Sequence, residues 1–207
     1  MDDMKIIKTD RRFCSSCMSE HDVKTVLMRN RNIIKGVRVE YEGTYTYCDI
    51  ADELFMDEEQ MHMNDVNMKD AYRRNVGLLT SAEIIAIRAK YQISQKDLCI
   101  LLGWGEKTIS RYESHQIQDR AHDLVLKKIN QDPEWFISLL EDARERFSRK
   151  SYEKYVSAAN AAINGIQTGM IEKILSIPEW MNEQAVAANI NFSQLLQDAL
   201  KEKLHLA

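Results

Sequence analysis

The stretch that decides the fold reads ISQKDLCILLGWGEKTISRYE and covers residues 93–113. Apolar residues recur in it at helical spacing, and Ser94 stands where a helix-capping residue is needed, with Asp97 three positions later. Gly103 to Gly105 then interrupt the run, because glycine tolerates the left-handed backbone of a tight turn. The pattern predicts two helices joined by a turn, preceded by a helix that Thr80 or Ser81 caps.

The helix after the turn has two different sides. Ile109 and Tyr112 are three residues apart and are predicted to face inward together. The outer side then carries long donors and hydroxyls, which reach base edges and phosphates in the major groove of DNA. These candidate DNA-binding residues are Lys107, Thr108, Ser110 and Arg111. At the start of the preceding helix, Ser94, Gln95 and Lys96 are predicted to meet the DNA backbone, because free amides there favour a phosphate.

Residues 93–98 and 103–113 together resemble the phage-repressor-like (Xre) helix-turn-helix domain. More narrowly, they resemble the MqsA-like antitoxins, which join a zinc finger to a helix-turn-helix. The resemblance implies a lambda-repressor-like helical bundle, and it implies that Lys107 and Arg111 contact bases. The alternative is an ordinary three-helix packing motif with solvated lysines.

Charge limits how this segment could bind DNA. Residues 81–131 carry eight positive and six negative side chains, and the whole chain of 207 residues has a net charge of −4. Binding therefore cannot rest on bulk charge, and it requires local placement of cations and a dimer that doubles the contacts. No apolar run reaches transmembrane length and the start of the chain is not a signal peptide, so we expect a cytoplasmic protein with reduced cysteines.

The N-terminal segment contains a CxxC pair, Cys14 and Cys17, and a distant third cysteine, Cys48. Residues 23–28 and 33–41 alternate as strands, and Glu42-Gly43-Thr44 is predicted to turn the chain back in a β-hairpin. The MqsA-like resemblance implies zinc held by four cysteines, but alanine stands at position 51, where the fourth is expected. Structural zinc takes four ligands, so Asp49, Asp52 and His21 are the candidates for the fourth. The alternatives are a zinc-ribbon fold without metal and cysteine redox catalysis, for which no βαβ pattern is present.

Residues 52–70 are acidic and rich in methionine. Methionine adapts to irregular surfaces, so this segment could dock a basic, RNA-binding toxin. The alternative is a helical connector with solvated carboxylates. Arg73 and Arg74 follow it, and they are predicted either to touch phosphate or to form salt bridges with the acidic run.

The end of the chain, residues 171–204, has a short β-branched segment followed by two amphipathic helices. It resembles the ribbon-helix-helix module of HicB-type antitoxins, through the spacing around Ile177-Pro178-Glu179-Trp180 and Asn191-Phe192-Ser193-Gln194. Such a module is too small to bury its own core, so a second copy of the chain is implied. The outward residues of the ribbon carry no positive charge, which favours dimerisation over DNA reading. The alternative is a helical hairpin packed on its own chain.

Together these patterns predict a mainly α protein with a small β-rich N-terminal region, a lambda-repressor-like bundle and a ribbon-helix-helix tail. The expected domains are a zinc-ribbon-like, toxin-binding region (1–70), a DNA-binding domain (71–148), a helical connector (149–169) and a dimerisation module (170–207). The expected function is a homodimeric repressor that reads operator DNA as the antitoxin of a type II toxin–antitoxin pair. The alternatives are a phage or mobile-element regulator without a toxin, and an enzyme, for which no catalytic constellation emerges.

Overall fold

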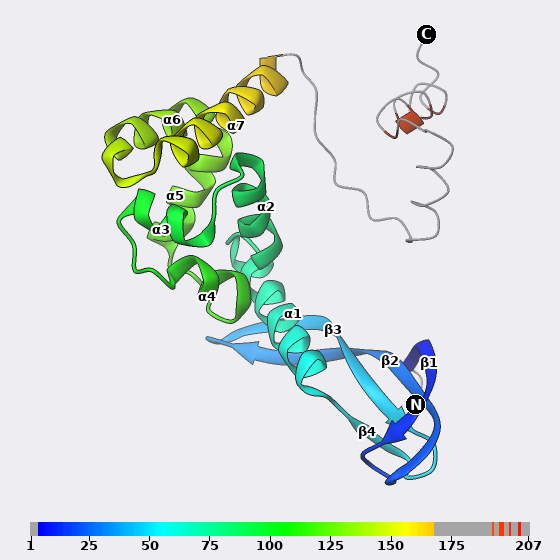
Figure 1. Cartoon of the computed structure of the whole chain (residues 1–207). Coiled ribbons are helices and arrows are strands. Elements are labelled where there is room, and N and C mark those ends of the chain that lie inside the picture. The colour runs from blue at the N-terminus through cyan, green and yellow to red at the C-terminus, as the bar shows by residue number, and fades with distance from the viewer. Residues whose placement is uncertain (1–3, 168–191, 193–194, 197–198, 200–202, 204–207) are drawn as a thin grey trace. The chain divides into compact units, whose positions relative to one another are not determined.

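A computed structural model describes residues 4–167 together with residues 192, 195, 196, 199 and 203. The chain divides into two compact units, Met1–Thr168 and Gly169–Ala207, and residues 4–167 lie in the first. It begins with a four-stranded antiparallel sheet in the order β1-β2-β3-β4 (Figure 1). The strands are β1 (Met4–Cys14), β2 (Ser19–Ile34), β3 (Val37–Cys48) and β4 (Glu53–Phe55).

The long β2–β3 hairpin turns at Lys35 and Gly36, both of which have positive φ. Two central residues with positive φ form the turn whose twist matches the flanking strands. The predicted turn at Glu42-Gly43-Thr44 was wrong, because β3 passes straight through these residues. Gly43 is needed for space instead: an added Cβ would lie 2.5 Å from Asn30 Nδ2. Glycine in a strand often marks such a close approach.

Helix α1 (Glu58–Val76) lies along β3 and supplies hydrogen-bonding groups to the strand edge that β4 leaves open. Asn64 accepts a hydrogen bond from Thr44 N (2.7 Å) and donates one to Thr44 O (2.8 Å). Asn67 donates to Glu42 O (3.2 Å), and Asn75 donates to Arg38 O (2.9 Å). The amides on α1 therefore satisfy backbone groups that an unprotected edge strand would expose.

The remaining helices pack around one apolar core. They are α2 (Ser81–Tyr91), α3 (Gln95–Leu102), α4 (Thr108–Ser114), α5 (Arg120–Gln131), α6 (Pro133–Asp142) and α7 (Arg149–Gln167), with a 3₁₀ turn at Arg144–Arg146. Tyr91 stacks on Phe136 with ring centroids 3.9 Å apart. Tyr155 and Ala159 of α7 are buried in the same core, so α7 is part of this helical packing.

The predicted helix boundaries in this region are largely confirmed. Thr80 caps α2 in a reciprocal box with Glu83, and the Ser94 side chain accepts a hydrogen bond from Asp97 N. Gly103 ends α3 with a φ of +66°. The predicted inner residue Ile109 is fully buried. Local capping and periodicity were sufficient here because the signals lie within a few residues of one another.

The expected fold class was wrong. Its β region is not small, since β1, β2 and β3 have 11, 16 and 12 residues. The chain is a four-stranded sheet followed by seven helices in the described residues, rather than a mainly α lambda-repressor-like bundle with a ribbon-helix-helix. The sequence analysis predicted no strand at the position of β1, so it underestimated the sheet. It also missed the attachment of α1 to the sheet, because this attachment uses side-chain amides that hydrophobic periodicity does not detect.

The predicted ribbon-helix-helix at residues 171–204 falls almost wholly outside the described residues. Within the described part of the chain, none of the helices combines the length and the apolar composition that spanning a membrane requires.

Candidate functional site

Four side chains at one end of the sheet form a candidate metal centre: Cys14, Cys17, His21 and Cys48. Their ligand atoms all lie within 4.8 Å of one another. Two turns bring them together, residues 15–18 between β1 and β2 and residues 49–52 between β3 and β4. With Val23, Cys14 and Cys48 are the buried centre of this small region, so the site takes the place of a larger apolar core.

Backbone N–H groups in the two turns point at the first cysteine of each. Ala51 N donates to Cys48 Sγ at 3.3 Å, and Cys14 receives hydrogen bonds from the backbone of Cys17 and Ser16. Burial opposes ionisation of Cys48, but hydrogen bonds from Ala51, Cys14 and Ile50 outweigh it and lower the pKa of its thiol. The Ser19 hydroxyl, 3.1 Å from Cys17 Sγ, lowers the pKa of Cys17. Such donors favour the thiolates of Cys17 and Cys48, and the thiolate is the form that binds metal. The backbone donors at Cys14 are outweighed by burial and by the neighbouring Cys48 and Cys17 thiols, so the pKa of Cys14 is raised.

His21 is oriented as a metal ligand. Its Nδ1 lies 3.0 Å from Asp22 O, where an Nδ1–H can donate, and its Nε2 lies 3.5 Å from Cys48 Sγ. A hydrogen bond from one ring nitrogen to a carbonyl leaves the other nitrogen's lone pair for the metal. His21 was one of the three candidates for the fourth ligand, and it is the one the structure places in the cluster.

The two competing carboxylates are occupied elsewhere. Asp49 forms an ion pair with Lys24 (2.7 Å), and Asp52 accepts a hydrogen bond from Tyr47 Oη (2.5 Å). The remaining donor set of three sulfurs and one imidazole nitrogen is a usual one for structural zinc. Tetrahedral zinc with bonds of about 2.3 Å to sulfur separates sulfurs by roughly 3.8 Å, which fits a cluster of this size. The residues can therefore hold a metal ion such as zinc.

The predicted DNA-binding residues of α4 divide into exposed and half-buried positions. Lys107 and Arg111 are exposed, whereas Thr108 and Ser110 are half-buried. Ser110 Oγ donates to Lys107 O at 3.0 Å, which engages this hydroxyl within its own helix. On the opposite side, Ile109 is 0% and Tyr112 is 5% exposed. The two long cations therefore lie on the side of α4 that does not pack on the core.

The turn before α4 is held by aromatic contacts. The Trp104 ring stacks on His122 with centroids 3.9 Å apart, and Tyr112 Oη lies 2.7 Å from His122 Nδ1. The His122 ring therefore contacts both aromatic rings, and its Nδ1 lies 3.8 Å from Asp119 Oδ2. Offset aromatic packing of this kind restricts the orientation of the elements it joins, so α4 is fixed at its start.

At the start of α3, the predicted backbone-binding residues make contacts within the protein. Ser94 caps the helix, Gln95 Nε2 donates to Glu113 Oε2 (2.5 Å), and exposed Lys96 lies 3.5 Å from Glu106. Glu113 also forms a two-bond ion pair with Arg88 of α2. Glu113, which sequence reasoning missed, thus links α2, α3 and α4. A bidentate arginine–carboxylate pair fixes the relative orientation of the two helices that carry it, in addition to pairing their charges.

Arg73 is a second residue whose role the sequence left open. It is 1% exposed and donates to Asp70 (2.6 Å), Gln118 (3.0 Å) and the carbonyls of Tyr112 and Gln116 (both 2.7 Å). The alternative that Arg73 pairs with the acidic run is confirmed, because Asp70 belongs to that run. A phosphate contact is wrong for this buried residue.

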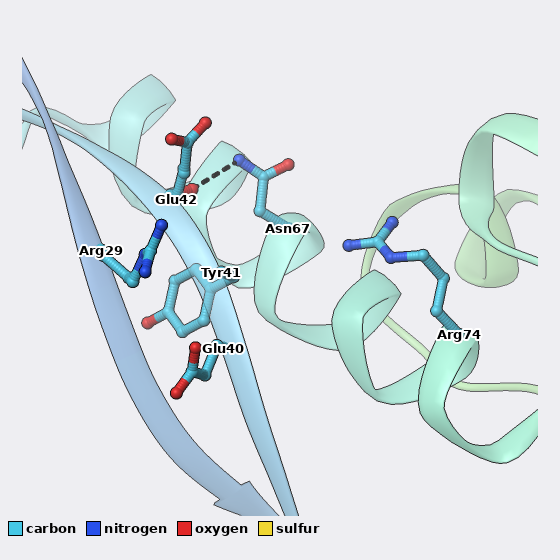
Figure 2. Close-up of a pocket in the computed structure, with 6 residues that line it drawn as sticks. All are labelled: Arg29, Glu40, Tyr41, Glu42, Asn67 and Arg74. Carbon is cyan, nitrogen blue, oxygen red and sulfur yellow. Dashed lines mark hydrogen bonds between the residues drawn. The ribbon is translucent and has the colours of Figure 1, made fainter.

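A groove of about 570 Å³ lies between β2, β3 and α1. Figure 2 shows its lining side chains, among them Arg29, Glu42 and Arg74, and it marks the hydrogen bond from Asn67 to Glu42 O. Arg29 is paired with Glu42 in the strand register. The lining mixes both signs of charge, which does not select one class of ligand.

Comparison with known proteins found no matching family, no matching curated protein and no matching solved structure. The resemblances to MqsA-like and HicB-type antitoxins therefore gain no support from these comparisons. What the structure supports is coarser: a cluster of three cysteines and one histidine that could bind a metal, as in a zinc finger.

Proposed function

We propose that this protein is a sequence-specific DNA-binding transcriptional repressor. The observation that supports this best is the two-sided character of α4, which buries Ile109 and Tyr112 and leaves Lys107 and Arg111 exposed. A helix that reads the major groove needs a fixed apolar side and long donors on the other. Arg111 can form a paired hydrogen bond with a guanine, and Lys107 can reach a base or a phosphate.

The contacts around α4 suit such a role because a helix that reads bases must be held in a fixed orientation. Trp104 packs at its start, Glu113 links it to α2 and α3, and Arg73 binds carbonyls at its end. The charge of residues 81–131 adds little general attraction, so we propose a homodimer that reads two half-sites and doubles the specific contacts.

A finer proposal is that the repressor is an antitoxin of the MqsA-like kind that inhibits a toxin and regulates its own operon. The support is the metal end of the sheet, where three large apolar side chains lie exposed: Phe13 (57%), Met18 (71%) and Ile50 (63%). Apolar side chains exposed at one end of a sheet make that end a candidate interaction site. Co-expression with the genes adjacent to the one that encodes this protein tests this proposal: growth arrest that this protein relieves supports it, and adjacent genes without toxicity refute it.

The DNA-reading proposal is tested by selecting bound duplexes from a randomised pool with the full chain, then comparing Arg111→Ala with wild type. Loss of a paired base contact is expected to weaken binding to the selected duplex by about 1–3 kcal/mol and to relax one base position. The control is Arg149→Ala, which removes an exposed arginine of α7 that pairs with Glu153. An Arg111→Ala chain with unchanged affinity and sequence preference would reject α4 as the reader.

A further inference from the structure

We propose that the tip of the β2–β3 hairpin is a second DNA-binding surface, where Lys35 and Arg38 contact phosphates beside the groove that α4 enters. This inference rests on the proposed function and extends it to a part of the chain outside the α3–α4 pair. It starts from a local excess of charge: residues 29–39 contain four basic side chains and no acidic one, in a chain whose net charge is −4.

The strand register shows which of these cations are available. Arg31 is opposite Glu40 and forms an ion pair with it at 2.8 Å, and Arg29 is opposite Glu42. Lys35 and Arg38 have no acidic residue opposite them. Both side chains are exposed, and neither forms a hydrogen bond or an ion pair with any residue in the described part of the chain. Two uncompensated cations therefore remain at the tip.

The hairpin tip is held rather than free. Its turn uses positive φ at Lys35 and Gly36, and Asn75 of α1 donates a hydrogen bond to Arg38 O at 2.9 Å. The same contact leaves the Arg38 guanidinium unengaged, because it uses only the backbone carbonyl. A cation on a fixed backbone loses less conformational freedom on binding than one on a mobile loop.

The end of α1 connects the tip to α4. Asn75 holds the hairpin, and Arg73, two residues earlier, donates to Tyr112 O and Gln116 O at the end of α4. In Figure 1 the β2–β3 hairpin runs along α1 toward the helices. The hairpin tip and the end of α4 are thus both hydrogen-bonded to side chains from the last turn of α1. DNA-binding domains commonly add contacts to the backbone beside the groove that their recognition helix occupies.

The chemistry at the tip selects phosphate rather than bases. Lysine and arginine on a turn supply point charge and donors that any DNA sequence satisfies, so the tip should add affinity without sequence preference. It would also supply the positive charge that residues 81–131 largely lack.

The test compares the double variant Lys35→Gln/Arg38→Gln with wild type, as full chains, on the selected duplex and on a mixed-sequence duplex of the same length. Fluorescence anisotropy across salt concentrations gives the slope of log affinity against log salt. Loss of two phosphate contacts should reduce this slope by about 1.8 on both duplexes. The variant's deficit in affinity should therefore shrink about 12-fold between 50 and 200 mM salt.

The control removes the same two charges from the edge strand β1, as Lys5→Gln/Arg11→Gln. Both residues are exposed and have no ion pair within residues 4–167. This variant is expected to keep the wild-type slope. A hairpin variant that behaves like the β1 variant would overturn the inference while leaving α4 as the reader. A wild-type chain that binds neither duplex would refute the proposed function itself, so the two failures are distinct.

Discussion

Replacing Arg73 by methionine tests whether the polar network at the end of α1, which joins this helix to α2 and α4, stabilises the fold. The guanidinium makes four hydrogen bonds, to Asp70, to Gln118 and to two backbone carbonyls in and after α4. Methionine has a similar length and fills space, but it donates to none of these groups. The substitution therefore removes the interactions and creates little cavity.

The magnitude follows from burial. Arg73 is 1% and Asp70 is 8% exposed, so removing the cation leaves a carboxylate with little access to water. Ser81 still donates to Asp70 from its backbone N (2.8 Å) and its Oγ (2.6 Å), which limits the loss. Breaking a buried pair by removing one partner costs about 3–5 kcal/mol. With a urea m-value of about 2 kcal/mol/M, the unfolding midpoint should fall by roughly 2 M.

The matched control is Arg74→Met at the next position. Arg74 is exposed and forms no ion pair within residues 4–167, so its loss should change stability by less than about 0.5 kcal/mol. Urea unfolding followed by circular dichroism measures both variants. Equal midpoints for Arg73→Met and Arg74→Met would refute the reasoning, because they would show that the buried network contributes no net stability.

Three further substitutions test other parts of the structure. His21→Ala should weaken Zn²⁺ binding by about 100-fold or more. Adding Ala51→Cys to this variant should restore binding, because residue 51 occupies the position in its turn that Cys17 occupies in the other. Chelator competition measures both affinities, and an unchanged affinity in His21→Ala would exclude the imidazole as a ligand. Tyr155→Phe should lose about 1–2 kcal/mol, because it removes an O–H donated to a carboxylate of α3 at 2.5 Å. Burial, with that hydrogen bond, raises the pKa of Tyr155 to about 12. The greater free energy of unfolding of wild type is therefore fully present below pH 10.0 and should disappear as the pH rises from there to 12. A difference in unfolding free energy that stays constant over this range would contradict the prediction. Gly43→Ala should destabilise the fold by about 1–3 kcal/mol in thermal or urea unfolding. Gly105→Ala should not, because its Cβ would make only an ordinary contact at 3.4 Å. Equal effects would show that Asn30 of β2 can move away from an added Cβ.

The helical part could be predicted well where the determinants are local. Ser94 and Asp97, or Thr80 and Glu83, are three residues apart, so one short window contains both partners of each cap. The buried side of α4 followed from the spacing of its apolar residues in the same way. These signals persist because capping and periodicity act within one or two helical turns.

The sheet was harder because its determinants are distant in sequence. Gly43 resembled a turn residue, but its role depends on Asn30, thirteen positions earlier, which donates to Met28 O and accepts from Tyr45 Oη. Asn30 cannot move away without losing both bonds. The glycine pattern therefore identified a constrained position and assigned it the wrong conformation, since a turn and a close approach both favour glycine.

For the metal centre, the sequence limited the fourth ligand to three residues but could not choose among them. His21 lies seven positions after Cys14 and 27 before Cys48, and the sequence has no second CxxC pair that would complete a four-ligand site. The pairing of β1 with β2 places Arg12 opposite His21, and the second turn brings Cys48 to the same end. The identity of the fourth ligand thus depended on strand register. Asp49 and Asp52 are not available as ligands because they are bound to Lys24 and Tyr47.

Helix α1 shows what composition alone could not predict about the region between the sheet and the helices, which is the set of contacts that its polar residues make. Its polar residues read as the solvated face of a connector, yet Asn64 pairs with the backbone of Thr44 in both directions and Arg73 is buried. An amide that bonds a strand edge and an arginine that binds helix carbonyls both need polar atoms at fixed positions. Helix α1 thus contacts the sheet through Asn64 and the end of α4 through Arg73. The low hydrophobicity of α1 therefore reflects two polar interfaces as well as an exposed side that carries Glu58, Glu59 and His62.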